Sequence, residues 1–204
     1  NISASGTATS YSWDNGLGIG TNFGVTPGVN TTYIVTGTDA NSCVAVDSVI
    51  VSVNPLPNVV ASNDTAICVG DVANLSATGA TNYNWDNGLG AGQNQSPSPI
   101  VNTTYIVTGT DGNGCAGIDS VIVTVNPLPN VVASNDTTIC LGDPANLSAT
   151  GATNYNWDNG LGAGQNQTPS PIINTTYIVT GTDGNGCSNT DTVVVTVSNC
   201  ATPP

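Results

Sequence analysis

The sequence predicts an all-β protein built from three tandem β-sandwich domains, and two observations carry this prediction. A 72-residue unit repeats along the chain, marked most clearly by Trp13, Trp85 and Trp157. Within each unit, short runs of alternating or β-branched residues are separated by turns rich in Gly, Asn and Pro, and a helical period is absent. A fixed repeat of this length is typical of an array of like modules.

The second unit shows why each strand is expected. Residues 73–78 (ANLSAT) and 82–85 (NYNW) alternate apolar and polar side chains, as half-buried strands do. Residues 103–110 (TTYIVTGT) are strongly β-forming, and the following Asp-Gly-Asn-Gly is a tight hairpin signal. The strands expected in this unit are residues 59–61, 73–78, 82–85, 103–110 and 119–125.

The order of these landmarks predicts an immunoglobulin-like sandwich. A Gly turn precedes the second strand, Trp85 lies on the third strand, and Tyr105 begins the penultimate strand near a tyrosine-corner position. The usual disulfide between the two sheets is absent, because Leu75 and Val107 occupy that neighbourhood. The core residues expected in the three units are Trp13, Trp85, Trp157, Tyr33, Tyr105 and Tyr177.

The repeat also sets the predicted domain boundaries. The first repeat covers residues 1–54, the second 55–126 and the third 127–199, followed by a C-terminal tail at 200–204. The joints, Asn-Pro-Leu-Pro at 54–57 and 126–129, are short and Pro-rich, which predicts semi-rigid spacers.

The first repeat is expected to be incomplete. Aligning Asn1 with Asn74 and Asn146 shows that it starts at its second strand, so its first strand and a counterpart of Cys68 are missing. A missing edge strand leaves backbone N–H and C=O groups unpaired. Two explanations stay open: the chain, which begins at Asn1 rather than Met, is part of a longer array, or a neighbouring chain supplies the strand by β-strand addition.

Composition excludes several classes of function. The chain contains no Lys, Arg or His, and its thirteen acidic residues are all Asp, so the formal net charge is −13. Binding of nucleic acid or anionic lipid head groups is not expected, because both require cationic side chains. Membrane insertion is not expected either, because no apolar run of about 18 residues is present. With no His, Lys or Glu to act as a general base, we expect no enzymatic activity and no cofactor.

Six cysteines at repeating positions predict disulfides and an oxidising compartment. The simplest pairs are Cys68–Cys115 and Cys140–Cys187, one in each complete repeat. Cys43 and Cys200 would then remain for head-to-tail bonds between successive chains. In an immunoglobulin topology, however, Cys68 and Cys115 lie near opposite poles, so pairing from one repeat to the next, such as Cys68 with Cys187, is an alternative.

Four segments form a specific combination: residues 11–18 (YSWDNGLG), 30–43 (NTTYIVTGTDANSC), 67–70 (ICVG) and 111–115 (DGNGC). Together they resemble the Ig-like or PKD-like repeats of large Bacteroidetes surface proteins, including gliding-motility-type adhesins exported by the type IX system. The resemblance covers all three repeats and implies an extracellular, cell-surface and non-enzymatic setting.

Two kinds of modification or ligand site also follow from the pattern. Asp followed by Ser or Thr and a mostly apolar residue resembles the O-glycan acceptor pattern of Bacteroidetes, and ordinary strand alternation explains it equally well. The acceptors would be Ser48, Thr65, Ser120, Thr137 and Thr192. Asp39, Asp111 and Asp183 in the hairpins are candidate calcium ligands, although Asp in these positions is also favourable turn chemistry.

These observations predict a structural repeat unit of an extracellular fibre or adhesin stalk. The expected partners are the chain itself, assembling head to tail by strand complementation, disulfides or both, or flanking repeats of a longer chain. The alternative function is an adhesin module that binds glycans or surfaces through its loops.

Overall fold

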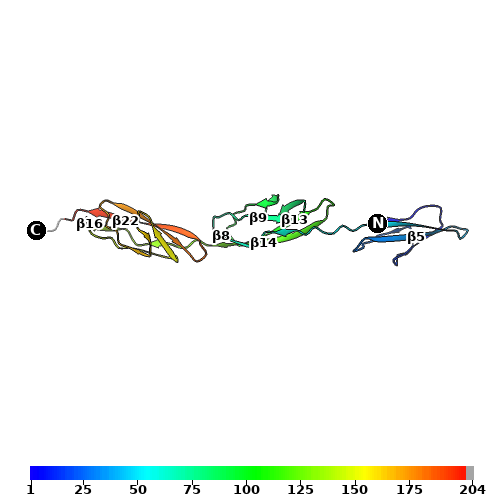
Figure 1. Ribbon diagram of the computed structural model, residues 1–204, viewed down its shortest axis with the longest axis horizontal. Coiled ribbons are helices and arrows are strands. Elements are labelled where there is room, and N and C mark those ends of the chain that lie inside the picture. The colour runs from blue at the N-terminus through cyan, green and yellow to red at the C-terminus, as the bar shows by residue number, and fades with distance from the viewer. Residues whose placement is uncertain (201–204) are drawn as a thin grey trace. The chain divides into compact units, whose positions relative to one another are not determined.

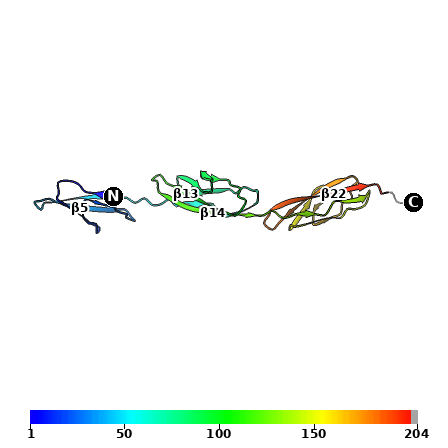
Figure 2. The ribbon, with the colours of Figure 1, turned by 180° about the vertical axis from the view of Figure 1, so that it is seen from behind.

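The computed structural model describes residues 1–200, and all regular structure in that range is β-strand (Figures 1 and 2). The protein has three immunoglobulin-like β-sandwich domains, as the landmarks predicted. Within the described range, no helix is long and apolar enough to cross a membrane. The chain divides into two compact units: residues 1–57 with the hairpin 111–115, and the residues from 58 onward without that hairpin.

The second repeat shows the complete sandwich. Its strands are β7 (Val60–Ala61), β8 (Thr65–Cys68), β9 (Leu75–Thr78), β10 (Asn82–Trp85), β11 (Gly90–Ala91), β12 (Asn94–Gln95), β13 (Thr103–Thr110) and β14 (Ala116–Asn126). One sheet has the order β11-β10-β13-β14-β8, and the other has the order β12-β9-β7. All pairs are antiparallel except that of β8 with β14, which is parallel and sets Cys68 opposite Asn126.

The third repeat has the same two sheets. Its strands are β15 (Val132–Ala133), β16 (Thr137–Cys140), β17 (Leu147–Thr150), β18 (Asn154–Trp157), β19 (Gly162–Ala163), β20 (Asn166–Gln167), β21 (Thr175–Thr182) and β22 (Ser188–Ser198). The sheet orders are β16-β22-β21-β18-β19 and β15-β17-β20. The equivalence extends to register, because the parallel pair of β16 with β22 sets Cys140 opposite Ser198.

The first repeat lacks two strands rather than one. Its strands are β1 (Ile2–Ser3), β2 (Ser10–Trp13), β3 (Gly18–Ile19), β4 (Asn22–Phe23), β5 (Thr31–Thr38) and β6 (Val44–Val51). Its sheets have the orders β3-β2-β5-β6 and β1-β4, so each lacks the edge strand that β7 or β8 supplies in the second repeat. The expectation of one missing strand was incomplete, because one continuous segment provides an edge to each sheet in turn.

Each sandwich closes around its Trp and Tyr. Trp85 and Tyr105 are buried with Leu75, Val107 and Val121 between the two sheets. The indole nitrogen of Trp85 donates a hydrogen bond to the carbonyl of Gly92 at 3.0 Å, which satisfies the one polar atom of a buried ring. The equivalent third-repeat core contains Trp157 and Tyr177, whereas the buried cluster of the first repeat is Ile2, Trp13 and Tyr33.

Glycines allow the leader segment, defined here as residues 55–68 and the equivalent residues 127–140, to lie close to the rest of its repeat. Gly79 has φ of +91°, and a side chain there would collide with the carbonyl of Asn58. A Cβ on Gly109 would lie 2.5 Å from Cγ2 of Val59. In the third repeat, a side chain on Gly151 would collide with the carbonyl of Asn130, and one on Gly181 would collide with Val131. Each of these glycines therefore marks a place where the leader segment crosses.

Candidate functional site

A disulfide links the second repeat to the third. Cys68, at the end of β8, bonds to Cys187, which lies in the hairpin between β21 and β22, with the Cα atoms 5.5 Å apart. The parallel register explains the position of Cys68, because it lies opposite Asn126, the residue directly before the Pro127 joint. The cysteine is thus carried to the end of its own repeat, where the next repeat begins, and the Cys187 side chain is fully buried.

The structure corrects the simplest expected pairing, Cys68–Cys115 and Cys140–Cys187. Cys115 directly precedes β14, and Cys68 lies opposite the last residue of that strand. A strand rises about 3.3 Å per residue, so the ends of β14 are about 30 Å apart. A disulfide needs Cα atoms within about 7 Å. The inter-repeat alternative, Cys68 with Cys187, is the pairing that the structure contains.

Cys200 also differs from its expected role. It bonds to Cys140, with the Cα atoms 5.3 Å apart, because β16 places Cys140 opposite Ser198, two residues before Cys200. Cys200 is therefore not left over for a bond between chains. The cysteines without a disulfide among residues 1–200 are Cys43, which is exposed, and Cys115, which is half-buried.

The hairpin aspartates organise their own loops. Oδ1 of Asp111 accepts hydrogen bonds from the backbone N–H groups of Asn113 and Cys115, each at 2.9 Å. Asp39 and Asp183 make the equivalent bonds. Calcium requires six to eight oxygen ligands, and residues 1–200 contain no group of three or more His, Cys, Asp or Glu side chains that could hold a metal ion. The carboxylates of Asp39, Asp111 and Asp183 each accept two backbone hydrogen bonds of their own hairpin, which fits turn formation.

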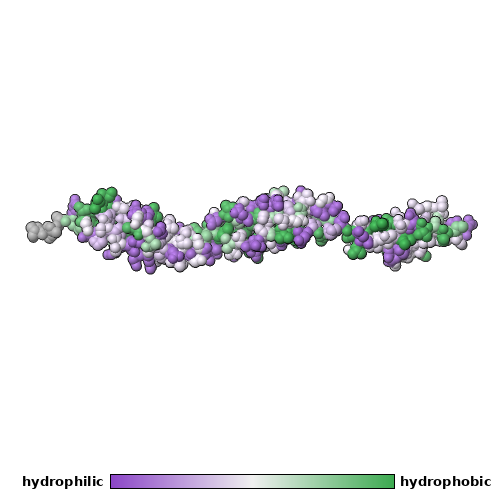
Figure 3. Space-filling view, in the orientation of Figure 1, coloured by the Kyte–Doolittle hydropathy of each residue, from purple (hydrophilic) through white to green (hydrophobic). Residues whose placement is uncertain are grey.

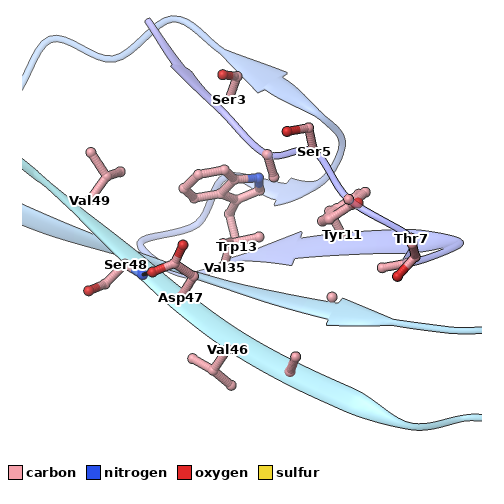
Figure 4. A pocket seen from close by; sticks show the side chains of 15 residues that line it. Ser3, Ser5, Thr7, Tyr11, Trp13, Val35, Val46, Asp47, Ser48 and Val49 are labelled. Atoms are coloured by element: carbon pink, nitrogen blue, oxygen red, sulfur yellow. Dashed lines mark hydrogen bonds between the residues drawn. The ribbon is translucent and has the colours of Figure 1, made fainter.

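The first repeat contains an open groove of about 410 Å³. Figure 4 shows Trp13 between the segment that carries Ser3 and Ser5 and the strand that carries Asp47 and Val49. Residues equivalent to two of its lining residues contact the leader segment in the second repeat: Gly109 faces Val59, and Asp119 binds Ala61. The groove therefore lies where the leader segment would be.

The carboxylate of Asp119 binds the leader segment of the second repeat through a hydrogen bond. Its Oδ2 accepts a hydrogen bond from the backbone N–H of Ala61 at 2.8 Å, and its Oδ1 accepts one from Ser120. The bond from Ala61 and then the bond from Ser120 lower the pKa of Asp119, against a smaller opposing effect of burial. Asp191 has a lowered pKa for the same reason, with Ala133 and Thr192 as donors. A carboxylate thus anchors the leader segment in both complete repeats.

The equivalent groups of the first repeat lack these partners. Among residues 1–200, Asp47 accepts a hydrogen bond from Ser48 alone, and the buried hydroxyl of Tyr11 has no partner. The equivalent hydroxyl of Tyr83 both accepts from and donates to the backbone of Ala80 at 2.9 Å. Val49 is 38% exposed, whereas its counterpart Val121 is 0% exposed. Figure 3 shows hydrophobic residues on the visible face of the first repeat.

The remaining predicted residues occupy expected environments. Trp13, Tyr33, Trp85, Tyr105, Trp157 and Tyr177 are buried. Burial, with a smaller effect of the nearby charge of Asp86, raises the pKa of Tyr105, and Asp158 acts likewise beside Tyr177. The predicted glycan acceptors are accessible on strands: Ser48, Ser120 and Thr192 are exposed, and Thr65 and Thr137 are half-buried.

Sequence reasoning missed β8, β16 and the groove. The run Thr65–Cys68 is only four residues long, and it is not among the strands expected from the sequence. A usable signal was present, because Asp119 and Gly109 recur in the first repeat as Asp47 and Gly37, although their partners in the leader segment do not.

The chain shows similarity to solved structures. No protein-family model matches it, and no curated protein sequence matches it. Among solved structures, a Ca²⁺-stabilized adhesin with which an Antarctic bacterium binds ice is 15% identical over 85% of this chain, with a TM-score of 0.40. The chain spans 58% of the length of that structure.

Two further solved structures are similar to the chain. The insect immune protein hemolin is 16% identical over 92% of this chain and 67% of its own, with a TM-score of 0.38. An I-band fragment of titin is 10% identical over 96% of this chain and 90% of its own, with a TM-score of 0.41.

Proposed function

We propose that this chain is a structural repeat unit of an extracellular cell-surface fibre or adhesin stalk. The observation that carries the proposal is the disulfide between Cys68 and Cys187, which joins one sandwich to the next. A covalent link beside a Pro-rich joint gives two connections between the repeats, the backbone and the S–S bond. Two connections restrict bending and twisting at the joint far more than a single linker does, which suits a protein that holds length outside the cell.

Two further features support this setting. Disulfides persist in oxidising compartments, and the chain carries two of them. The absence of Lys and Arg leaves no cleavage site for trypsin-like proteases. We propose that the chain assembles head to tail, with copies or flanking repeats of the same type as its partners, and that it does so without catalysis, a cofactor or nucleic acid.

Electron microscopy of native surface material tests this function. We expect filaments or long stalks that antibodies against the chain decorate at a regular spacing, and we expect them to become more flexible after reduction of the disulfides. A protein found only inside intact cells, or only as dispersed monomers at the cell surface, would contradict a role in an extracellular fibre.

A second function is favoured by one repeated surface feature. The loop before β13 exposes Ile100 and Val101, and the equivalent loop before β21 exposes Ile172 and Ile173. Large aliphatic side chains that are this exposed in equivalent loops suit contact with a surface or with the apolar face of a glycan. Adhesion assays with Ile172→Ser and Ile173→Ser test this alternative, because a loop adhesin loses binding and a passive stalk does not.

A further inference from the structure

We propose that the groove of the first repeat binds an extended peptide segment of the leader sequence type, donated by a neighbouring chain, and that Cys115 forms a disulfide with the cysteine at the end of that segment. This inference rests on the proposed head-to-tail assembly and names its binding site, its ligand and its covalent bond. The ligand is defined by the two complete repeats, in which the segments 55–68 and 127–140 occupy the equivalent place.

The groove retains the groups that hold the leader segment elsewhere. Gly37 is equivalent to Gly109, whose missing side chain leaves room for Val59, and to Gly181, which leaves room for Val131. No leader Val lies against Gly37, whose added Cβ would instead meet Ala8 at 3.1 Å. Gly37 is the penultimate residue of β5, and a glycine within a strand costs strand stability. The space that it leaves for an incoming Val side chain gives the glycine a structural reason.

The polar groups of the groove define the direction and register of the segment. Asp47 would accept the N–H of the donated Ala, as Asp119 accepts that of Ala61. A donated Asp would accept the N–H of Ile50, as Asp64 accepts that of Ile122 at 2.8 Å. The segment would thus run antiparallel to β1 and then parallel to β6, as β7 and β8 run in the second repeat.

The open edge of β6 supports the same register. β14 continues to Asn126, and its last four residues pair with β8. β6 ends at Val51, so the equivalent residues 52–54 are not part of a strand. Strand addition would extend β6, cover Val49 and complete both sheets at once. Within the chain, the segments 55–68 and 127–140 are engaged in their own repeats.

The cysteines indicate how the donated segment is locked. The last residue of β8, Cys68, bonds to Cys187 in the hairpin of the following repeat. The equivalent hairpin cysteine of the second repeat is Cys115, which has no disulfide and is half-buried. The repeat before it lacks the strand that would end in the matching cysteine. A leader segment seated in the first repeat supplies a cysteine at that position.

The covalent step is a thiol–disulfide exchange. The Cys115 thiolate attacks the sulfur of a donor cysteine that is held as a mixed disulfide with a small thiol such as glutathione. A new S–S bond forms, the bond to the small thiol breaks, and the departing thiolate takes up a proton. Noncovalent seating of the segment precedes this step and does not depend on it.

The test mixes the full chain with a synthetic peptide that has the sequence of residues 127–140, in a glutathione redox buffer. We expect one peptide to bind per chain, a change in the fluorescence of Trp13, and a disulfide between the peptide and Cys115 on peptide mapping by mass spectrometry. Cys115→Ser should abolish the covalent product and keep reversible binding. Cys43→Ser, which removes the other unpaired thiol, should change neither.

Two variants test the register without relying on the cysteines. A peptide with Asp in place of the Val equivalent to Val131 should bind about tenfold more weakly or worse, because a charge would replace the side chain that faces Gly37. Gly37→Ala in the chain should also weaken binding, and Gly28→Ala, at an open and exposed position, should not. Circular dichroism of each variant checks that the fold is retained.

The outcomes separate this inference from the proposed function. Equal binding of the native and Asp-substituted peptides, or cross-linking to Cys43 as readily as to Cys115, overturns the inference. If native fibres form but their Cys115 is found bonded within its own chain, the donor is not a neighbouring chain, although the fibre function stands. Specific peptide binding in a protein that never forms fibres supports the groove and overturns the function.

Discussion

Because the groove of the first repeat is open to solvent, truncating two equivalent valines, Val121 of the second repeat and Val49 of the first, should change the unfolding free energy by different amounts. Val121 is fully buried between the sheets, whereas Val49 faces the open groove. Replacing Val121 by Ala removes the equivalent of two buried methylene groups at about 0.8 kcal/mol each and leaves a small cavity. We expect a loss of about 2 kcal/mol in the unfolding free energy of the second repeat.

Val49→Ala should cost much less, under about 1 kcal/mol, because the side chain is partly solvated already. For a domain of this size, 1 kcal/mol corresponds to about 4–8 °C in Tm. Calorimetry should therefore show the second-repeat transition about 8–16 °C lower in Val121→Ala and a shift of a few degrees at most in Val49→Ala. Hydrogen-exchange mass spectrometry assigns each transition to its repeat.

Addition of the leader peptide provides the decisive control. Once the groove is filled, Val49 becomes as buried as Val121, and the stabilisation that the peptide gives should be smaller for Val49→Ala than for the native chain. Equal losses of stability for Val49→Ala and Val121→Ala without peptide would refute the reasoning, because they would mean that solvent does not reach Val49.

Three other predictions address the remaining features. Because the pKa of Asp119 is lowered in the folded state, its stabilisation is present above the ordinary carboxyl pKa and is lost as the pH falls through the folded value; pH titration of unfolding below about pH 4 should show a shallower dependence for Asp119→Asn. Cys187→Ser should leave each sandwich folded but loosen the joint between the second and third repeats, which small-angle scattering should register as a broader distribution of distances; an unchanged distribution would show that the joint is rigid without sulfur. Peptide-level mass spectrometry of native material should show added sugar mass on the peptides that contain Ser48, Thr65, Ser120, Thr137 and Thr192 if these residues carry glycans, and Ala substitution at these positions should remove that mass.

Local pattern was sufficient for most strands. Alternation and β-branching located the runs at 82–85 and 103–110 with the bounds that β10 and β13 have. Local sequence pattern did not locate all the strands at the sheet edges, because those strands are short. β8 has four residues and is held by a parallel pair with β14, a partner more than fifty residues away, so its sequence carries little local signal.

The cysteine pairing was ambiguous for a similar reason. Repeating positions predicted disulfides, and the simplest arrangement was one bond within each complete repeat, with Cys68 bonded to Cys115 in the second. The register of β8 against β14 places Cys68 at the far end of the repeat and so excludes that pair. A disulfide depends on two Cα atoms meeting in space, which spacing along the chain does not report.

From the sequence alone it follows that the chain is an all-β array, that it repeats every 72 residues, and that its acidic composition does not suit anionic partners. These properties are local or additive, so they can be counted along the chain. The tertiary structure decided between the cysteine pairings that the sequence left open, and it revealed the groove of the first repeat. Both outcomes depend on the leader segment, which crosses from one sheet to the other, and the path of a crossing segment is decided by packing against distant strands.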